Sequence, residues 1–308
     1  MEKSIVVWNR QQGKEEVEQV FGDAWVQFLY GTSVGKKLAD QFLSRSWVSQ
    51  VVGRYQDTRF SARKVDAFVK KFQIPMEEFE PGPFLNFNEF FIRQFKPGQR
   101  EFVSADNEMG AFAEARYLAY EKVGLEERFP VKGKWLSASA LLGDESNAKV
   151  FEGGPMLLAR LCPTDYHRFH FPDSGEVLKQ YTISGKLHSV NPLALQAKPE
   201  ILITNERQVS LLKTEHFGNL AFVEVGALCV GRIVQTFGSN SGAVSAQAAF
   251  KKGQEKGYFL FGGSTVIVLG EPGLWRPDAD LLEQTQKGRE SRVRLGERVA
   301  VAPLRGVD

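Results

Sequence analysis

The sequence predicts an α+β protein in which an N-terminal helical region, residues 1–95, precedes a β-rich barrel or sandwich, residues 96–308. Apolar residues recur at helical spacing from about residue 14 to residue 93. After Pro97-Gly98 the apolar runs become short and are separated by Gly, Pro, Asn and Asp. Neither a Gly-x-Gly-x-x-Gly nor a Walker-type loop occurs, so the common nucleotide-binding α/β folds are not indicated.

The composition is that of an ordinary globular protein. Of the 308 residues 43% are hydrophobic and 25% are charged, which suffices for one large or two ordinary domains. The formal net charge of +2 gives no argument for a nucleic-acid partner. Because no 18 apolar residues run together and the N-terminus soon becomes polar, we expect cytoplasmic synthesis without a membrane-spanning helix. Cys162 and Cys229 lie in apolar, strand-like surroundings, which predicts buried free thiols.

The N-terminal region combines helical patterning with aromatic and basic residues. Ser61 is a candidate N-cap for a helix that stops at Pro75, and Asn86 with Glu89 resembles a capping box. Between residues 24 and 75, nine basic residues face three acidic ones, a local balance of +6. Amphipathic helices of this kind bind anionic membrane surfaces. Packing of the aromatic faces on the rest of the protein explains the pattern equally well.

The β-rich region is predicted from short runs of strand-forming residues bounded by turn residues. A short helix at residues 281–286 and a strand-like end close the chain. The spacing of the runs is typical of a barrel or sandwich rather than of βαβ units. The predicted strands are 117–120, 156–161, 176–178, 208–212, 220–225, 228–236 and 265–269.

Ser264 is the candidate nucleophile. It follows two glycines in Phe261-Gly262-Gly263-Ser264-Thr265 and precedes a β-branched run, so it lies at a permissive turn that enters a strand. A plain hairpin turn is the competing interpretation. A reactive serine needs a histidine that accepts its proton, and that histidine needs a carboxylate that holds its tautomer.

The histidines narrow the choice of base. Two of the four, His167 and His170, lie in the polar and aromatic run 165–172. In a regular strand they would point to opposite faces, whereas on a bend they could converge. Their HxxH spacing lacks a clear third ligand, so no metal site is predicted.

Four motifs, in order and at the expected approximate spacing, resemble those of the phosphatidylserine decarboxylases. Two N-terminal segments, 55–60 and 88–98, are similar to the longer form of this family, and the resemblance covers nearly the whole chain. The four motifs are Tyr166-His167-Arg168-Phe169-His170, Leu187-His188-Ser189-Val190-Asn191-Pro192, the run 225–231 and Phe261-Gly262-Gly263-Ser264-Thr265.

The resemblance implies a proenzyme that cleaves itself between Gly263 and Ser264 into a large subunit, 1–263, and a small subunit, 264–308. Ser264 Oγ attacks the Gly263 carbonyl, and elimination from the resulting ester leads to a pyruvoyl group derived from Ser264. This group is the implied cofactor. Its ketone forms a Schiff base with phosphatidylserine and accepts electrons as CO2 leaves, which gives phosphatidylethanolamine in phospholipid biosynthesis.

The resemblance also implies roles for individual residues. His170 corresponds to the general base of self-cleavage, and His167 corresponds to a residue of the decarboxylation step. The acidic partner of the histidine differs from the family pattern, because Glu114 stands at the position where the family has aspartate. Glutamate can orient a histidine, so we prefer Glu114. Asp106 is the alternative, and it requires a gap in the match.

The partners implied by the resemblance are phosphatidylserine, a membrane surface and the two subunits of one precursor, and a homodimer is compatible with it. We expect peripheral association with the cytoplasmic face of the cell membrane and no nucleic-acid partner. Two other functions stay open: a soluble pyruvoyl-dependent amino-acid decarboxylase and a lipid-binding homologue that does not process. A serine hydrolase is disfavoured because no Gly-x-Ser-x-Gly motif surrounds Ser264.

Overall fold

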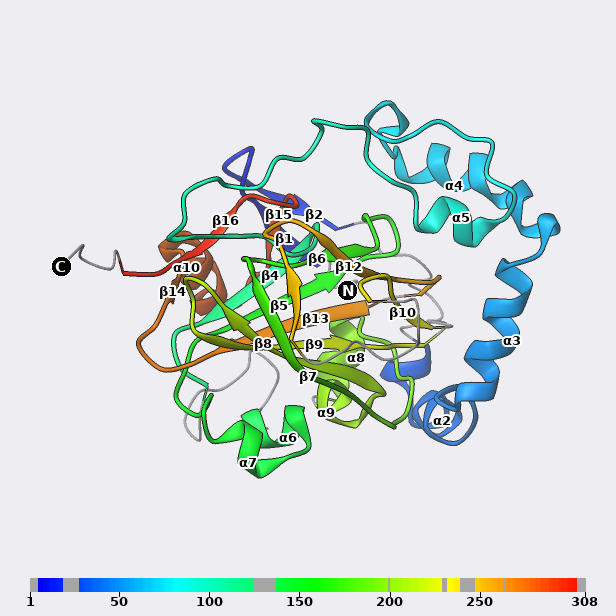
Figure 1. Cartoon of the computed structure of the whole chain (residues 1–308). Coiled ribbons are helices and arrows are strands. Elements are labelled where there is room, and N and C mark those ends of the chain that lie inside the picture. Colours follow the sequence, from blue (N-terminus) through cyan, green and yellow to red (C-terminus); the bar gives the residue numbers. More distant parts are fainter. Residues whose placement is uncertain are drawn as a thin grey trace.

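A ten-stranded sheet forms the centre of the protein (Figure 1). The computed structural model describes residues 5–18, 28–123, 137–198, 200–228, 232–238, 247–262 and 264–303. The strand order of the large sheet is β11 (Ala248–Phe250), β7 (Gly175–Ile183), β8 (Arg207–Thr214), β9 (Asn219–Val225), β13 (Ser264–Gly270), β5 (Met156–Leu161), β4 (Ala115–Tyr120), β15 (Ser291–Val293), β1 (Val6–Asn9) and β2 (Lys14–Val17).

Two three-stranded sheets accompany the large one. Every pairing within the three sheets is antiparallel except that of β1 with β15, which is parallel. Because the large sheet ends at β11 and β2, its described strands form an open layer and not a closed barrel. The small sheets are β10 (Ile233–Gln235), β12 (Glu255–Phe259), β6 (Arg168–His170), and β14 (Arg276–Pro277), β16 (Arg298–Val301), β3 (Glu108–Gly110).

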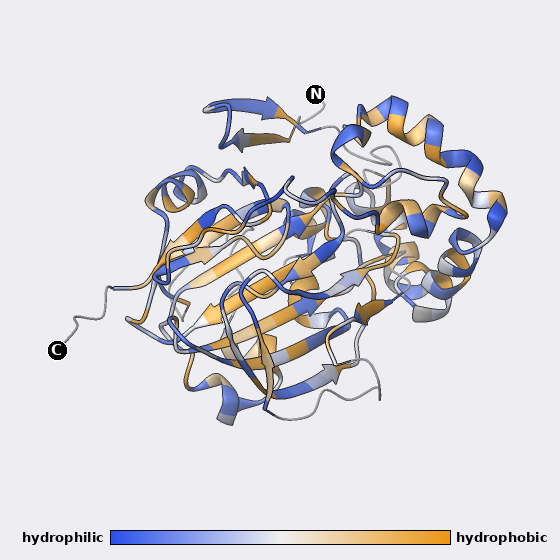
Figure 2. Ribbon diagram, turned by 45° about the horizontal axis from the view of Figure 1, so that its top comes forward, coloured by the Kyte–Doolittle hydropathy of each residue, from blue (hydrophilic) through white to orange (hydrophobic). Residues whose placement is uncertain are grey.

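The middle strands of the large sheet are buried on both faces. Every residue of β13, β5 and β4 is buried, so these strands read as continuous apolar runs without alternation. The hydropathy colouring shows the apolar residues gathered along the strands (Figure 2). The predicted strands are confirmed, with 228–236 reduced to β10 and residues 229–231 outside the described part.

The N-terminal region differs in part from the prediction. Its first described elements are β1 and β2, so the helical prediction is wrong for Lys14–Val17. Residues 28–31 are helical, and the described helices and helical turns that follow them begin with α2. They are α2 (Ser33–Leu38), the π-helical turn η1 (Ala39–Leu43), α3 (Ser46–Gln56), the 3-10 turn η2 (Arg59–Lys64), α4 (Val65–Phe72), the 3-10 turn η3 (Met76–Glu78) and α5 (Phe87–Phe91).

The two predicted caps have different outcomes. Asn86 caps α5, because its side chain accepts a hydrogen bond from the N–H of Glu89 at 2.9 Å. Ser61 does not cap a helix, because the helical turn η2 already begins at residue 59. The hydroxyl of Ser61 instead donates to the carbonyl of Gln56 and accepts the N–H of Phe87, each at 2.8 Å.

Helix α5 joins the helical region to the sheets. An apolar cluster combines residues of α4 and α5 with Tyr166, Phe261 and Leu295 of the β-rich part. Helix α3 lies on the outer side of the molecule, away from the large sheet (Figure 1). The helical region is therefore attached at two places: through α5, and through Leu29, Tyr30 and Ala39, which belong to the main apolar core.

The remaining helices are short. The predicted C-terminal helix and strands are confirmed as α10, β15 and β16. Among the described residues, no helix is long and apolar enough to cross a membrane. The helices are α6 (Ala138–Leu142), α7 (Glu145–Ala148), α8 (Pro192–Ala197), α9 (Ile201–Thr204) and α10 (Ala279–Gln286).

Candidate functional site

Ser264 is the first residue of the central strand β13 and is completely buried. It pairs with Leu161 of β5, and the next residue, Thr265, pairs with Val225 of β9. Gly262, two residues earlier, has φ 143°, a backbone conformation that residues with a side chain rarely adopt. Gly263 lies outside the described residues. The candidate nucleophile therefore stands where a glycine turn enters a strand that is held on both sides.

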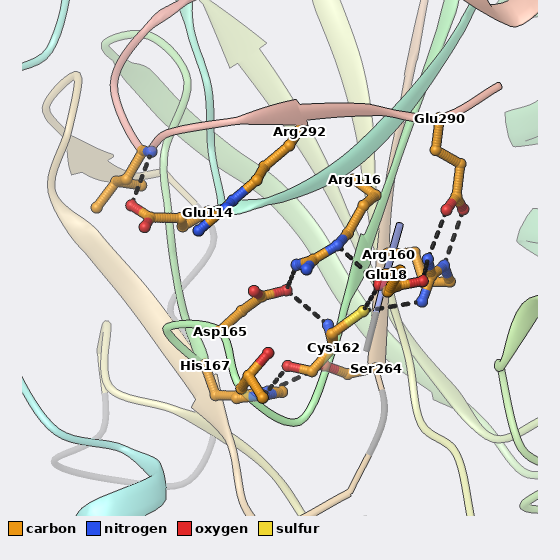
Figure 3. Close-up of polar contacts among 12 residues, drawn as sticks. Glu18, Glu114, Arg116, Arg160, Cys162, Asp165, His167, Ser264, Glu290 and Arg292 are labelled. Carbon is orange, nitrogen blue, oxygen red and sulfur yellow. Dashed lines mark hydrogen bonds and ion pairs between the residues drawn. The ribbon is translucent and has the colours of Figure 1, made fainter. Parts of the chain in front are cut away.

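His167 is the histidine that faces Ser264 (Figure 3). Its Nδ1 lies 3.4 Å from Ser264 Oγ, and its Nε2 lies 2.8 Å from the carbonyl oxygen of Cys162. A carbonyl oxygen only accepts hydrogen bonds, so Nε2 carries the proton of the neutral ring. Nδ1 is then an acceptor directed at the Ser264 hydroxyl.

The surroundings of His167 keep its imidazole neutral. The side chain is fully buried, and the ring of Phe91 stacks on it at 3.8 Å with an interplanar angle of 21°. Burial lowers the pKa of His167 to about 3, and the positive charges of Arg93 and Arg116 act in the same direction. The ring is unprotonated at neutral pH and can accept a proton from a hydroxyl.

A buried cluster of ion pairs lies beside the His167 loop. Glu18 is paired with Arg116 at 2.9 Å and with Arg160 at 2.8 Å, and Arg116 is also paired with Asp165. Burial raises the pKa of Glu18, but the two guanidinium groups outweigh it and lower the pKa to about 2. The sequence did not lead us to these residues. The arginines inside the apolar runs 115–120 and 156–161 nevertheless indicate buried ion pairs, because arginine is rarely buried without a partner.

Cys162 belongs to the same cluster. The prediction of a buried free thiol is confirmed for Cys162, whose thiol donates to the carboxylate of Glu18. Burial raises the pKa of this thiol, so it stays protonated. Cys229 lies outside the described residues. Across the described ranges, no group of three or more His, Cys, Asp and Glu side chains is arranged to hold a metal ion.

Helix α5 holds the segment that precedes Ser264. The side-chain oxygen of Asn88 accepts the N–H of Phe261 at 2.9 Å, and its amide donates to Asp57 at 2.7 Å. The ring of Phe261 meets Phe87 and Phe91 edge to face, each at 5.2 Å. Phe91 therefore contacts both His167 and the segment that precedes Ser264. Sequence reasoning noted Asn88-Glu89-Phe90-Phe91 only as a family feature.

The structure does not bring His170 to Ser264. Its Nδ1 lies 3.0 Å from the carbonyl oxygen of Gly253, and its Nε2 lies 3.3 Å from the hydroxyl of Tyr166. Its pKa is lowered by burial. Because His170 ends strand β6 and His167 precedes that strand, the two rings have different surroundings. In the described contacts, His167 occupies the place beside Ser264 that was predicted for His170.

The two candidate acids also have other partners. Glu114 accepts from Arg100 at 2.6 Å and from the backbone N–H of Leu295 at 3.4 Å. Asp106 is exposed and lies 3.9 Å from His216. Among the described contacts, neither carboxylate is hydrogen-bonded to His167 or His170. The roles of Glu114 and Asp106 therefore stay predictions, and the described residues form no Ser264–His170–Glu114 chain.

Known proteins resemble this chain over almost its full length. The family model described as "Phosphatidylserine decarboxylase" matches residues 87–301. A "Phosphatidylserine decarboxylase proenzyme" of Clostridium novyi (strain NT) is 38% identical over 297 residues, which cover 96% of this chain and 98% of that protein. A protein of the same description from Clostridium beijerinckii is 37% identical over 302 residues, with 97% and 100% covered. The chain belongs to the phosphatidylserine decarboxylase family.

Proposed function

We propose that the chain is a proenzyme that cleaves itself between Gly263 and Ser264 and then converts phosphatidylserine to phosphatidylethanolamine and CO2. The observation that carries the proposal is the contact between the buried Ser264 hydroxyl and the neutral ring of His167, at 3.4 Å. Membership of the family and the name of its relatives as decarboxylase proenzymes support it. The reaction class is that of a carboxy-lyase.

Self-cleavage begins at the Ser264 hydroxyl. The proton of Oγ moves to Nδ1 of His167 while Oγ forms a bond to the carbonyl carbon of Gly263. The C–N bond between Gly263 and Ser264 then breaks, and the proton is returned to the freed amine of Ser264. A positioned base contributes about 10²- to 10⁴-fold to such a step. A distance of 3.4 Å is long for a hydrogen bond, and catalytic contacts often tighten only as the reaction proceeds.

The base is tested by separating the two histidines. We expect His167→Ala to accumulate the uncut 34.5 kDa chain, as Ser264→Ala does. His170→Ala, with His170 as the base implied by the family resemblance, is the comparison variant. Intact-mass analysis after a fixed synthesis time measures the cut fraction. Loss of cleavage in His170→Ala with normal cleavage in His167→Ala would instead assign the base to His170.

The residues around position 264 suit a pyruvoyl group formed from Ser264. Such a group acts as an electron sink for decarboxylation. Position 264 begins a strand paired with β5 on one side and with β9 on the other, so its backbone is fixed. His167 stands 3.4 Å from the Ser264 hydroxyl, where it can hold or move a proton. Phe91 stacks on the ring of His167, Phe261 packs against Phe91, and the buried ring is shielded from water.

Three experimental outcomes distinguish the proposed function from its alternatives. Cleaved protein that releases CO2 from phosphatidylserine vesicles, and not from free amino acids, is the expected result. Release from free amino acids alone would indicate a soluble amino-acid decarboxylase. An intact chain that binds vesicles would indicate a lipid-binding homologue. Ser264→Ala is the control, because it removes the only source of the proposed cofactor.

A peripheral membrane surface on helix α3 fits this substrate. The helix exposes three large apolar side chains, Trp47 by 55%, Val51 by 57% and Tyr55 by 43%. Its inner face buries Ser49, Gly53 and Gln56, and Val52 on that face packs against the apolar cluster around α5, so the three exposed side chains form a separate outer surface. Of the basic residues of this region, Arg45 and Arg54 lie at the two ends of α3 and the others lie on α2, η2 and α4, and such positive charges favour an anionic bilayer. Association with the cytoplasmic face and a homodimer stay predictions.

Co-sedimentation with vesicles tests this surface. Burial of one large apolar side chain contributes about 1.5 kcal/mol, roughly tenfold in partitioning. We expect Trp47→Ser in the Ser264→Ala precursor to reduce binding to phosphatidylserine vesicles by about that factor. Leu178→Ser is the matched control, because Leu178 is an exposed apolar residue of strand β7. Equal losses in the two variants would contradict a membrane surface on α3.

A further inference from the structure

Asp165 closes a tight turn that begins at Cys162. The backbone N–H of Asp165 donates to the carbonyl oxygen of Cys162 at 2.8 Å, as in a β-turn. The Asp165 carboxylate reaches back and accepts the backbone N–H of Cys162 at 2.7 Å. One residue therefore holds both the N–H and the C=O of Cys162, which restrains the two peptide groups on either side of this residue.

The fixed carbonyl of Cys162 determines the tautomer of His167. The same oxygen that accepts from Asp165 also lies 2.8 Å from His167 Nε2. Its position keeps the proton of the neutral ring on Nε2. The other tautomer would place an N–H of Nδ1 against the Ser264 hydroxyl, and that nitrogen could not accept a proton.

The Asp165 carboxylate is itself held in one orientation. It is buried, and Arg116 is paired with it. Arg116 is in turn paired with Glu18 at 2.9 Å. Arg93 donates to the carbonyl oxygen of Thr164 in the same turn at 2.9 Å. Figure 3 shows how Glu18, Arg116 and Asp165 are linked by ion pairs and how Asp165 is linked to Cys162 beside His167.

We propose that Asp165 is a positioning residue for His167, which acts by holding the Cys162 carbonyl against Nε2 and so directs the Nδ1 acceptor at Ser264. This inference rests on the proposed self-cleavage and adds a residue to it. The family resemblance assigns the acidic role to Glu114, which bonds to Arg100 and not to a histidine. Asp165 touches no reacting atom and acts through the turn.

The tautomer of His167 provides a direct test. Ser264→Ala precursor labelled with 15N-histidine reports by NMR which ring nitrogen carries the proton. We expect the ring of His167 to be in the single Nε2–H form in this protein. Asp165→Ala on the same background should give a mixture of both tautomers. Asp165→Asn keeps an oxygen that accepts the Cys162 N–H and should restore the single form.

Cleavage time courses in cell-free synthesis provide the second readout, in chains that keep Ser264. Loss of one hydrogen bond that positions the base corresponds to a cleavage rate about tenfold lower. We expect Asp165→Ala to slow cleavage by about tenfold or more and Asp165→Asn to stay within about threefold of the wild type. If Arg116 without its partner prevents folding of Asp165→Ala, the double variant Asp165→Ala/Arg116→Met removes the unpaired charge and serves for both measurements.

The outcomes separate this inference from the proposed function. An unchanged single tautomer together with a wild-type cleavage rate in Asp165→Ala, or in the double variant, would overturn the role of Asp165. A mixed tautomer in Asp165→Asn would also overturn it, because the acceptor is still present. If the wild type is never cut, the proposed function fails, and the tautomer in the Ser264→Ala background still decides the inference.

Discussion

The buried, neutral ring of His167 makes the stability of the precursor depend on pH. Burial lowers the pKa of His167 from 6.5 to about 3. Between these two values the unfolded chain binds a proton that the folded chain does not bind. The contribution of the neutral His167 ring to the free energy of unfolding is therefore fully present above pH 6.5, and it is lost progressively as the pH falls towards 3.

The size of this effect follows from the pKa difference. At pH 5 the solution lies about 1.5 units below the unfolded pKa, and each unit corresponds to about 1.36 kcal/mol. The folded ring stays neutral at this pH, so the free energy of unfolding should fall by about 2 kcal/mol between pH 7.5 and 5 through His167 alone. Solvent screening does not reduce this figure, because the side chain is fully buried.

Urea unfolding of two uncut precursors measures the effect. The first protein is Ser264→Ala, and the second is Ser264→Ala/His167→Phe, in which a ring can still stack on Phe91. The difference between their pH dependences isolates His167 from His170, whose pKa burial also lowers. Equal losses of stability between pH 7.5 and 5 in the two proteins would refute the reasoning. The ring of His167 would then titrate normally in the folded state.

Three further changes test the surroundings of the site. Asn88→Ala removes the acceptor of a backbone N–H in the cleavage segment and should slow self-cleavage about tenfold; an unchanged half-time in cell-free synthesis would contradict this role. Lys256→Met leaves the buried Glu224 without its ion pair and should cost about 3–5 kcal/mol, whereas Lys256→Met/Glu224→Gln should recover most of the loss in urea unfolding. Gly154→Ala would place a Cβ 1.8 Å from a backbone carbonyl oxygen of the strand β13, so a wild-type urea midpoint would contradict the observed close approach.

The strands of the β-rich part were predictable because their signal is local. Runs such as 156–161 and 265–269 are apolar, bounded by turn residues and too short for helices, and both are strands in the structure. The N-terminal strand Lys14–Val17 was missed for a physical reason. It is an edge strand with mostly exposed residues, so its polar sequence lacks the pattern that marks a buried strand.

The site itself was only partly predictable. The glycine turn before Ser264 and the histidine-rich run are local features of the sequence, so both could be predicted to belong to the site. Which histidine meets Ser264 depends on contacts between distant segments. His167 is 97 residues from Ser264, and its orientation is set by the Cys162 carbonyl and by the ring of Phe91. Hydrogen bonds to a backbone carbonyl leave no trace in residue identity, so the sequence could not distinguish His167 from His170.

The proposed cleavage point at the start of β13 has a consequence for the order of events in synthesis. The segment that follows the cut supplies β13 between β5 and β9, and β15 between β4 and β1. After the proposed cleavage, the small subunit would still contribute strands to the sheet of the large subunit at two places. Assembly has to be completed while the chain is still continuous, and a denatured, processed enzyme would have to reassemble from two separate polypeptides. Maturation is in this sense a one-way step, and only the uncut precursor can unfold and refold as a single chain.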